Sequence, residues 1–255
     1  MIALVTGASS GIGAAVARRL AAEPEARLVL VARRRERLEA LAAELGGATV
    51  IAADLCEEAA PALVARRVAD EHGRLDLLVN NAGVGGRGSF ADGGWAAVHR
   101  AMTINFDAQV RLTEALLPLL RRSAPSAVVN IGSVAGRVSR PGAGSYSASK
   151  FALAGWTEAL QMEEGPHGVH VTLVQPGYVA TEGFPQRKLL ARPWTRWMVS
   201  TDAKAAEGIV EVWRRRRPEA YLPRPYALVP LARVLLPGLY RRAVGGGAFT
   251  ASTRH

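Results

Sequence analysis

Apolar residues in this chain gather in short runs that alternate with longer amphipathic stretches. Runs typical of strands lie at residues 2–5, 27–32, 48–52, 75–79, 126–132 and 169–175. Stretches with apolar residues at helical spacing lie between them, among them 12–22, 35–45, 57–72, 95–121 and 146–163. This alternation predicts one α/β domain over residues 1–255, built on a doubly wound parallel sheet with helices on both faces.

The first of these units contains a glycine-rich turn. The apolar run at 2–5 leads into TGASSGIG at 6–13, and a helical pattern follows at once. Strand, glycine turn and helix in this order begin a dinucleotide-binding, Rossmann-like fold, although the spacing GxxxGxG differs from the common GxGxxG. Glycine lets the backbone turn tightly, and the helix N-terminus offers free N–H groups to a phosphate. We therefore expect pyrophosphate binding by Gly7, Ser9, Ser10, Gly11, Ile12 and Gly13.

A second group of residues points to proton transfer. Tyr146 and Lys150 are four residues apart, and Ser133 lies thirteen residues before the tyrosine. On a helix this spacing puts the ammonium beside the phenol, which lowers the pKa of Tyr146 from about 10 toward neutral pH. Such a phenol exchanges a proton with a carbonyl or an alcohol, and Ser133 can hold the same oxygen. The alternative is an ordinary amphipathic helix that carries Tyr and Lys by chance.

These motifs together resemble the short-chain dehydrogenase/reductase family. TGASSGIG at 6–13, NNAG at 80–83, Asn105, Ser133, YSASK at 146–150 and PG at 176–177 follow that family's order and spacing over residues 1–181. The resemblance implies an NAD(P)-dependent oxidoreductase that interconverts a carbonyl and an alcohol on a small molecule, and a homodimer or homotetramer. It implies a catalytic tetrad of Asn105, Ser133, Tyr146 and Lys150. Two alternatives are epimerase or lyase chemistry on the same fold and a non-catalytic cofactor-binding protein.

The resemblance also assigns further contacts with the cofactor. Tyr146 and Lys150 would touch it, Lys150 through the nicotinamide ribose, while Asn105 would kink its helix and hold a water for a proton relay. Asp54 and Leu55 would edge the adenine, although Asp54 as the N-cap of the helix at 57–72 is a competing interpretation. The remaining implied contacts are Asn81, Ala82, Gly83, Pro176, Gly177, Val179 and Thr181.

The end of the second strand predicts the choice of cofactor. NAD-binding proteins commonly place an acid there to hold the ribose 2′-hydroxyl, but this chain has Ala32 followed by Arg33. An arginine pairs with a 2′-phosphate by forked, charge-assisted hydrogen bonds, and Ser10 can add a hydroxyl. We therefore expect NADP(H) to be preferred over NAD(H). The alternative, a place at the solvated start of the next helix, is expected for Arg34 or Arg35 but not for all three arginines.

Charge is distributed unevenly along the chain, whose formal net charge is +10. Residues 213–255 hold nine arginines and one acid, Glu219, and so carry +8. Such a segment can meet an acidic substrate, an anionic membrane or nucleic acid, but its simplest explanation is a solvated, arginine-rich face. No recognition motif accompanies the charge, so nucleic acid is not an expected partner.

Two segments near the C-terminus are expected to shape the substrate side. Residues 182–203 are predicted to form a lid, and its apolar side chains favour an apolar substrate unless they simply pack on the body. They are Phe184, Leu189, Leu190, Trp194, Trp197 and Met198, with Arg187, Lys188, Arg192 and Arg196 available to an anionic substrate group. Residues 213–255 form a basic, proline-containing extension. We expect its apolar residues to pack on the body or on a second subunit, with membrane contact as the less favoured alternative.

Features of targeting and of metal binding are weak. The first strand begins at residue 2, no apolar run reaches the length of a membrane span, and Cys56 is the single cysteine. We therefore expect a cytoplasmic protein without an internal disulfide. The five histidines are scattered, and no metal is expected to take part in the chemistry.

Overall fold

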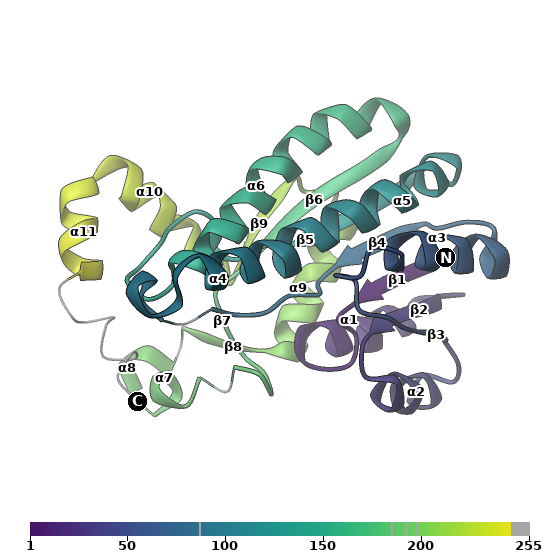
Figure 1. The fold of residues 1–255 in the computed structure, drawn as a ribbon, viewed down its shortest axis with the longest axis horizontal. Coiled ribbons are helices and arrows are strands. Elements are labelled where there is room, and N and C mark those ends of the chain that lie inside the picture. Colours follow the sequence, from purple (N-terminus) through teal and green to yellow (C-terminus); the bar gives the residue numbers. More distant parts are fainter. Residues whose placement is uncertain (87, 185, 192, 197, 246–255) are drawn as a thin grey trace.

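The structure is a computed structural model that describes residues 1–86, 88–184, 186–191, 193–196 and 198–245, with the backbone alone at 188 and 194. Its centre is a seven-stranded parallel sheet in the order β3-β2-β1-β4-β5-β6-β9 (Figure 1). The strands are β1 (Ile2–Thr6), β2 (Arg27–Ala32), β3 (Thr49–Ala52), β4 (Leu77–Asn80), β5 (Ser126–Ile131), β6 (Val169–Pro176) and β9 (Glu219–Leu222). The doubly wound α/β sheet expected from the sequence is thereby confirmed.

Alternate residues of each central strand serve opposite faces of the sheet. In β1, Ala3 and Val5 join one apolar core, whereas Ile2 and Leu4 join the other. The first core is covered by α1 (Gly11–Ala21), α2 (Arg35–Glu44) and α9 (Asp202–Arg214). The second is covered by α3 (Ala60–His72), α5 (Ala108–Arg122) and α6 (Gly144–Glu164). Because both faces are buried, the strands are continuous apolar runs rather than alternating ones.

The long helical pattern expected at 95–121 is divided in the structure. It comprises α4 (Phe90–Met102), a π-helical turn at Thr103–Asp107, and α5. The start is earlier than expected because Ser89 and Asp92 form a capping box, in which each side chain accepts from the other's backbone N–H. The π turn is the kind of local irregularity that marks functional positions in helices, and it contains Asn105.

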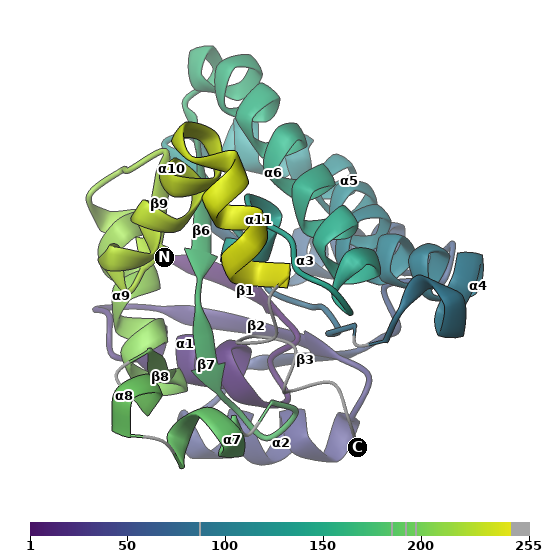
Figure 2. The same ribbon diagram turned by 90° about the vertical axis from the view of Figure 1, so that its left-hand side faces the viewer.

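The chain after residue 176 contains elements that the sequence pattern did not predict. A two-stranded parallel sheet joins β7 (Tyr178–Ala180) to β8 (Val199–Thr201), with α7 (Arg187–Leu190) and α8 (Pro193–Arg196) between them. Helix α9 follows, and strand β9 then adds to the edge of the main sheet beside β6. A helical hairpin, α10 (Leu228–Leu235) and α11 (Pro237–Gly245), comes last (Figure 2).

The expected packing of the C-terminal extension is confirmed only for its first part. Tyr226 is buried, and Trp213 and Leu222 are half-buried against the first core. Leu228, which was expected to be covered, is 65% exposed. The reason is geometric, because the segment breaks at Leu236, before Pro237, into two short helices that lie at the end of the molecule rather than on its flank (Figures 1 and 2).

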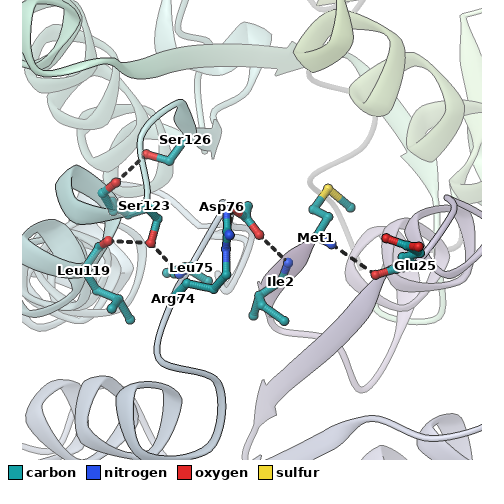
Figure 3. A network of polar contacts seen from close by, with 10 residues as sticks. Met1, Ile2, Glu25, Arg74, Leu75, Asp76, Leu119, Ser123 and Ser126 are labelled. Carbon is teal, nitrogen blue, oxygen red and sulfur yellow. Dashed lines mark hydrogen bonds and ion pairs between the residues drawn. The ribbon is translucent and has the colours of Figure 1, made fainter.

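The amino ends of the strands are tied by a polar network at the edge of the sheet away from the glycine turn (Figure 3). The Asp76 carboxylate accepts from the Ile2 N–H at 2.6 Å, and Ser123 Oγ accepts from the Leu75 N–H at 3.0 Å. These bonds satisfy backbone groups where the parallel strands begin. Among the described helices, none has the length and apolar character needed to span a membrane.

Candidate active site

A cavity of about 600 Å³ opens at the carboxyl ends of the parallel strands. It is lined by the turns that follow β1, β2, β3, β4, β5 and β6, the place where open α/β sheets bind ligands. Every site residue expected from the sequence lines this cavity except Gly13 and Asn105, which lie just beneath its surface. The structure thus brings together the expected residues of the glycine turn, the NNAG segment, Ser133, Tyr146, Lys150 and the PG segment.

The glycine turn is shaped to bring backbone close to a ligand. Gly7 has φ +65°, and a Cβ on Gly13 would lie 2.4 Å from the Gly7 carbonyl oxygen, so side chains are excluded at both positions. Ser10 is the N-cap of α1, yet its side chain makes no capping hydrogen bond. The first N–H groups of the helix therefore keep their donors for another acceptor, beside a wall lined by Gly11 and Ile12. This cradle fits a pyrophosphate group.

Arginines flank the same turn at the end of β2. Arg33 is mostly exposed and lies 3.8 Å from the Asp54 carboxylate. Arg34 and Arg35 are both exposed at the start of α2, as expected. The Arg34 guanidinium also donates to Ser10 Oγ at 2.8 Å and to Ser9 Oγ at 3.2 Å, which the sequence did not predict. It can reach the glycine turn because β2 lies next to β1 in the sheet. Arg35 pairs with Glu39.

Asp54 does not cap a helix. Helix α3 begins at Ala60 with Ala59 as its N-cap, so the competing interpretation of Asp54 as that cap is wrong. Its carboxylate instead accepts from the Cys56 N–H at 3.1 Å and holds the turn after β3 open toward the cavity. Leu55 is buried beside it and lines the same wall.

Tyr146 and Lys150 lie on α6 at the cavity, where Lys150 is buried and Tyr146 is half-buried. The Lys150 ammonium donates to the Ile131 carbonyl oxygen at 2.8 Å, and burial lowers the pKa of Lys150 to about 8. Burial also raises the pKa of Tyr146, and a hydrogen bond with Ser133 opposes this rise only in part. The expected fall in the pKa of Tyr146 is therefore not found, because the loss of hydration outweighs the helical spacing that suggested it.

Asn105 is fully buried, so a surface position is excluded for it. Its Oδ1 accepts from the Val84 N–H at 2.7 Å, and its Nδ2 donates to the Val84 carbonyl at 3.0 Å and to Ser149 Oγ at 2.9 Å. Ser149 Oγ in turn donates to the Tyr146 carbonyl at 2.8 Å. Asn105 thus joins the π turn, the loop after β4 and the first turns of α6, the helix that carries the tyrosine.

A polar chain behind Ser133 was not foreseen from the sequence. The Ser133 N–H donates to Gln175 Oε1 at 2.9 Å, and Gln175 Nε2 donates to Glu219 Oε1 at 3.0 Å. Glu219 lies on β9 and also accepts both donors of the Arg137 fork. Burial opposes its ionisation, but these hydrogen bonds and the Arg137 charge leave the pKa of Glu219 lowered. The available signal was the single acid of an otherwise basic segment.

The side of the cavity away from the glycine turn is mostly apolar, with Ser139, Arg140 and Gln186 as its polar members. Phe184 and Met198 of the expected lid line it, whereas Leu189 and Leu190 do not, and Arg187 and Arg196 are exposed outside it. Trp197 and Arg192 lie outside the described residues, as do the side chains of Trp194 and Lys188. Further lining comes from Val134, Val138, Tyr178, Tyr226, Val229, Tyr240 and Val244. No group of three or more His, Cys, Asp or Glu side chains able to hold a metal occurs in the described parts of the chain.

Comparison with known proteins places the chain in a family. The family model described as short chain dehydrogenase matches residues 1–189. The Dehydrogenase/reductase SDR family member 7B of Bos taurus is 31% identical over 97% of this chain and 81% of its own length. The 3-ketodihydrosphingosine reductase of Bacteroides thetaiotaomicron is 34% identical over 73% of this chain and 66% of its own. A short-chain dehydrogenase structure from Streptomyces avermitilis superposes with a TM-score of 0.81 at 30% identity, over 97% of both chains.

The chain therefore belongs to the short-chain dehydrogenase/reductase family. Membership of this family implies a dehydrogenase or reductase that uses NAD(P), and the motifs that suggested this membership all lie within the matched residues.

Proposed function

We propose that this protein is an NADP(H)-dependent oxidoreductase that interconverts a carbonyl and a primary or secondary alcohol on an apolar or amphipathic small molecule. The observation that carries the proposal is one cavity lined at one end by the glycine turn and at the other by Ser133, Tyr146 and Lys150. When bound, the nicotinamide cofactor supplies or accepts a hydride. Family membership supports the use of such a cofactor.

The residues that would hold the cofactor offer backbone N–H groups to it or let it approach the backbone closely. The N–H groups at the start of α1 would bind the pyrophosphate, Asp54 and Leu55 would border the adenine, and Arg33 would pair with a 2′-phosphate. Arg34, held above the turn by Ser9 and Ser10, adds a second cation to the same corner. Two cations and no acid at the end of β2 support NADP(H) over NAD(H). The other proposed contacts are Asn81, Ala82, Gly83, Pro176, Gly177, Val179 and Thr181.

Tyr146 and Lys150 on α6 would carry out the proton transfer. A phenol with a raised pKa holds its proton at neutral pH, so Tyr146 is ready to donate it to a carbonyl oxygen that gains charge. Ser133 would donate a hydrogen bond to the same oxygen, which helps most in the transition state. Lys150, with its pKa near 8, can carry charge beside the phenolate that remains and return a proton to it. Asn105 would position this helix and hold the relay water.

The walls of the cavity support the proposed substrate class. Beyond Tyr146 the lining is dominated by apolar and aromatic side chains, which exclude water from hydrocarbon but offer few hydrogen bonds. The names of two relatives agree, a 3-ketodihydrosphingosine reductase and the human Retinol dehydrogenase 8, the latter 38% identical over 74% of this chain and 61% of its own length. We extend to this chain only the chemistry those names share, a carbonyl or alcohol on a largely apolar molecule.

The decisive experiment measures NADPH absorbance with a series of ketones and aldehydes of increasing alkyl length, and with NADH in parallel. We expect NADPH oxidation that becomes more efficient as the alkyl chain grows. Product formed without net NADPH consumption would favour epimerase or lyase chemistry instead. Cofactor binding without turnover of any compound would favour a non-catalytic protein. Light scattering of the same preparation tests the proposed homodimer or homotetramer, and cell fractionation tests the proposed cytoplasmic location.

A further inference from the structure

The helical hairpin α10–α11 presents an uncovered apolar face at one end of the molecule. Leu235 is 65% exposed and Leu239 63% exposed, and four further apolar side chains of the hairpin are more than half exposed. They are Leu228, Leu231, Val234 and Leu236. Contiguous exposed apolar surface of this kind marks an interaction site in a soluble fold. Figure 2 views this end directly and shows both helices in front of the sheet.

Contacts on the inner side hold the hairpin in place. The Arg233 guanidinium donates to the Arg137 carbonyl at 2.7 Å and lies over the Phe151 ring, 5.3 Å from its centroid. The Tyr240 hydroxyl donates to the Ser139 carbonyl at 2.8 Å. These polar contacts turn one side of the hairpin toward the body, so the leucines on the other side remain outside.

Charge on the hairpin has one sign. Arg224, Arg233, Arg241 and Arg242 are all exposed, and residues 220–245 contain no acid. An apolar helical face bordered by arginines has the composition of helices that lie in the interface of an anionic bilayer. A second copy of this chain docked on the same face would bring two sets of arginines together, and like charges disfavour that arrangement.

Helix α4 adds aromatic side chains at the same end of the molecule. It begins near the hairpin end in Figure 1 and lies at the margin of that end in Figure 2. Phe90 and Trp95, in its first two turns, are 77% and 73% exposed. Aromatic side chains that are partly in contact with water are favoured at the boundary between lipid and water.

We infer that the α10–α11 hairpin is a docking surface for an anionic lipid bilayer, in which its exposed leucines enter the interface and Arg241 and Arg242 face the lipid headgroups. This surface is independent of the proposed reaction, because none of Leu231, Leu235, Leu239, Arg241 and Arg242 lines the cavity. The membrane contact that the sequence left as the less favoured alternative is the one that the exposed leucines support.

The test is co-sedimentation of the full chain with vesicles of phosphatidylcholine alone and of phosphatidylcholine with phosphatidylserine. We expect binding to the anionic vesicles that weakens as salt rises. Arg241→Glu with Arg242→Glu should lower the partition coefficient by more than about 25-fold, since the loss of each arginine near an anionic surface costs about fivefold and each added carboxylate is repelled. Leu235→Glu with Leu239→Glu should lower it about tenfold or more for each leucine removed.

Matched controls carry the same changes on other faces. Met162→Glu replaces an equally exposed apolar residue on α6, and Arg66→Glu with Arg122→Glu reverses two exposed charges on α3 and α5. Both controls should bind vesicles like the parent, and circular dichroism should show that all variants fold. Absence of vesicle binding, equal binding to neutral vesicles, or hairpin variants that bind like the parent would overturn the proposal. So would light scattering that shows the leucine changes splitting an oligomer while the parent ignores vesicles.

Discussion

The two ends of the cavity are built in different ways. At the cofactor end, the walls are backbone turns at the tips of strands, fixed by bonds such as those from the Asn81 and Ala82 N–H groups to Thr6 Oγ1, both at 2.9 Å. At the substrate end, the walls are side chains from the turn after β7 and from short helices that follow the main sheet, such as Phe184, Val229 and Tyr240. The first end depends on exact backbone approach, and the second on the volume and polarity of side chains.

This difference shows how one fold can keep its chemistry while its substrate changes. Substitutions at the cofactor end meet backbone atoms at once, as the 2.4 Å clash of a Cβ on Gly13 shows, and the cost of overpacking there is typically about 1–3 kcal/mol. Substitutions on α10 or α11 meet solvent or the open cavity. The substrate end can therefore vary with little effect on the cofactor end. Each prediction below tests one of these two ends.

The largest effect is expected from Tyr146→Phe. Loss of the only proposed proton donor should lower turnover about 10²–10⁴-fold, whereas NADPH affinity should stay nearly unchanged because the glycine turn is intact. Stopped-flow turnover and fluorescence titration with NADPH measure the two quantities separately. Turnover within a few-fold of the parent would show that another group supplies the proton.

A second test concerns the buried charge of Lys150. Its pKa in the folded protein is about 8, below its ordinary value near 10.5, so the cost of burying the ammonium is fully present below pH 8. Between pH 8 and 10.5 the folded protein releases this proton first, and its stability from this group rises by up to about 3 kcal/mol. Urea unfolding of the parent and of Lys150→Met at several pH values should show the parent gaining stability relative to the variant over that range. If the stabilities of the parent and of the variant changed in parallel with pH, the proposal that Lys150 carries a buried charge would be contradicted.

The preference for NADPH over NADH, measured as the ratio of the two kcat/KM values, should fall about tenfold to a hundredfold when the residues at the end of β2 are changed. Arg33→Ala with Ala32→Asp removes a charge-assisted bond to a 2′-phosphate and adds an acid that accepts from a ribose hydroxyl, so kcat/KM should move from NADPH toward NADH. Arg34→Ala should weaken the binding of NADPH but not the binding of NADH. The matched control is Arg35→Ala, since this arginine pairs with Glu39 outside the cavity. A parent enzyme that already prefers NADH would refute the assignment.

A smaller effect, on kcat, is expected from a substitution of Glu219, behind Ser133. Glu219→Ala removes the acceptor of both Gln175 and Arg137, so the Ser133 backbone loses its fixed partner and kcat should fall about five- to tenfold. Because Glu219 does not line the cavity, the KM for NADPH should not change. The control Glu44→Ala breaks a forked ion pair with Arg18 on the surface and should leave kcat unchanged. A parallel rise in the KM for NADPH would indicate general loosening instead of mispositioned Ser133.

The elements that sequence patterns predicted are those whose signal is local. The six predicted strands are short apolar runs, the glycine turn directly follows the first of them, and all of these elements are present. Strand β9 was missed because its four residues stand between Pro218 and Pro223, which indicate breaks rather than a strand. Helix α9 was also missed, although Thr201 caps it and its apolar residues recur at helical spacing.

The properties of the site that the sequence did not reveal depend on burial and on distant partners. Tyr146 and Lys150 were placed correctly on one helix, but their pKa values follow from the desolvation imposed by the surrounding strands. Arg34 reaches Ser9 and Ser10 across 24 residues or more, and Gln175 reaches Glu219 across 44. No short-range pattern encodes such pairs. The same limit applied to α10–α11, where apolar composition could not distinguish a covered helix from a bare one.

The α10–α11 hairpin has one further consequence, for how proteins of this kind diverge. Val229, Tyr240 and Val244 border the cavity, while Leu231, Leu235 and Leu239 on the same two helices point away from it. A short insertion or a shift of one residue in this hairpin would turn a helix by about 100° and so change which of its side chains border the cavity and which stand outside. Substrate preference and subcellular address would then change in a single evolutionary step, so the two traits are expected to be inherited together.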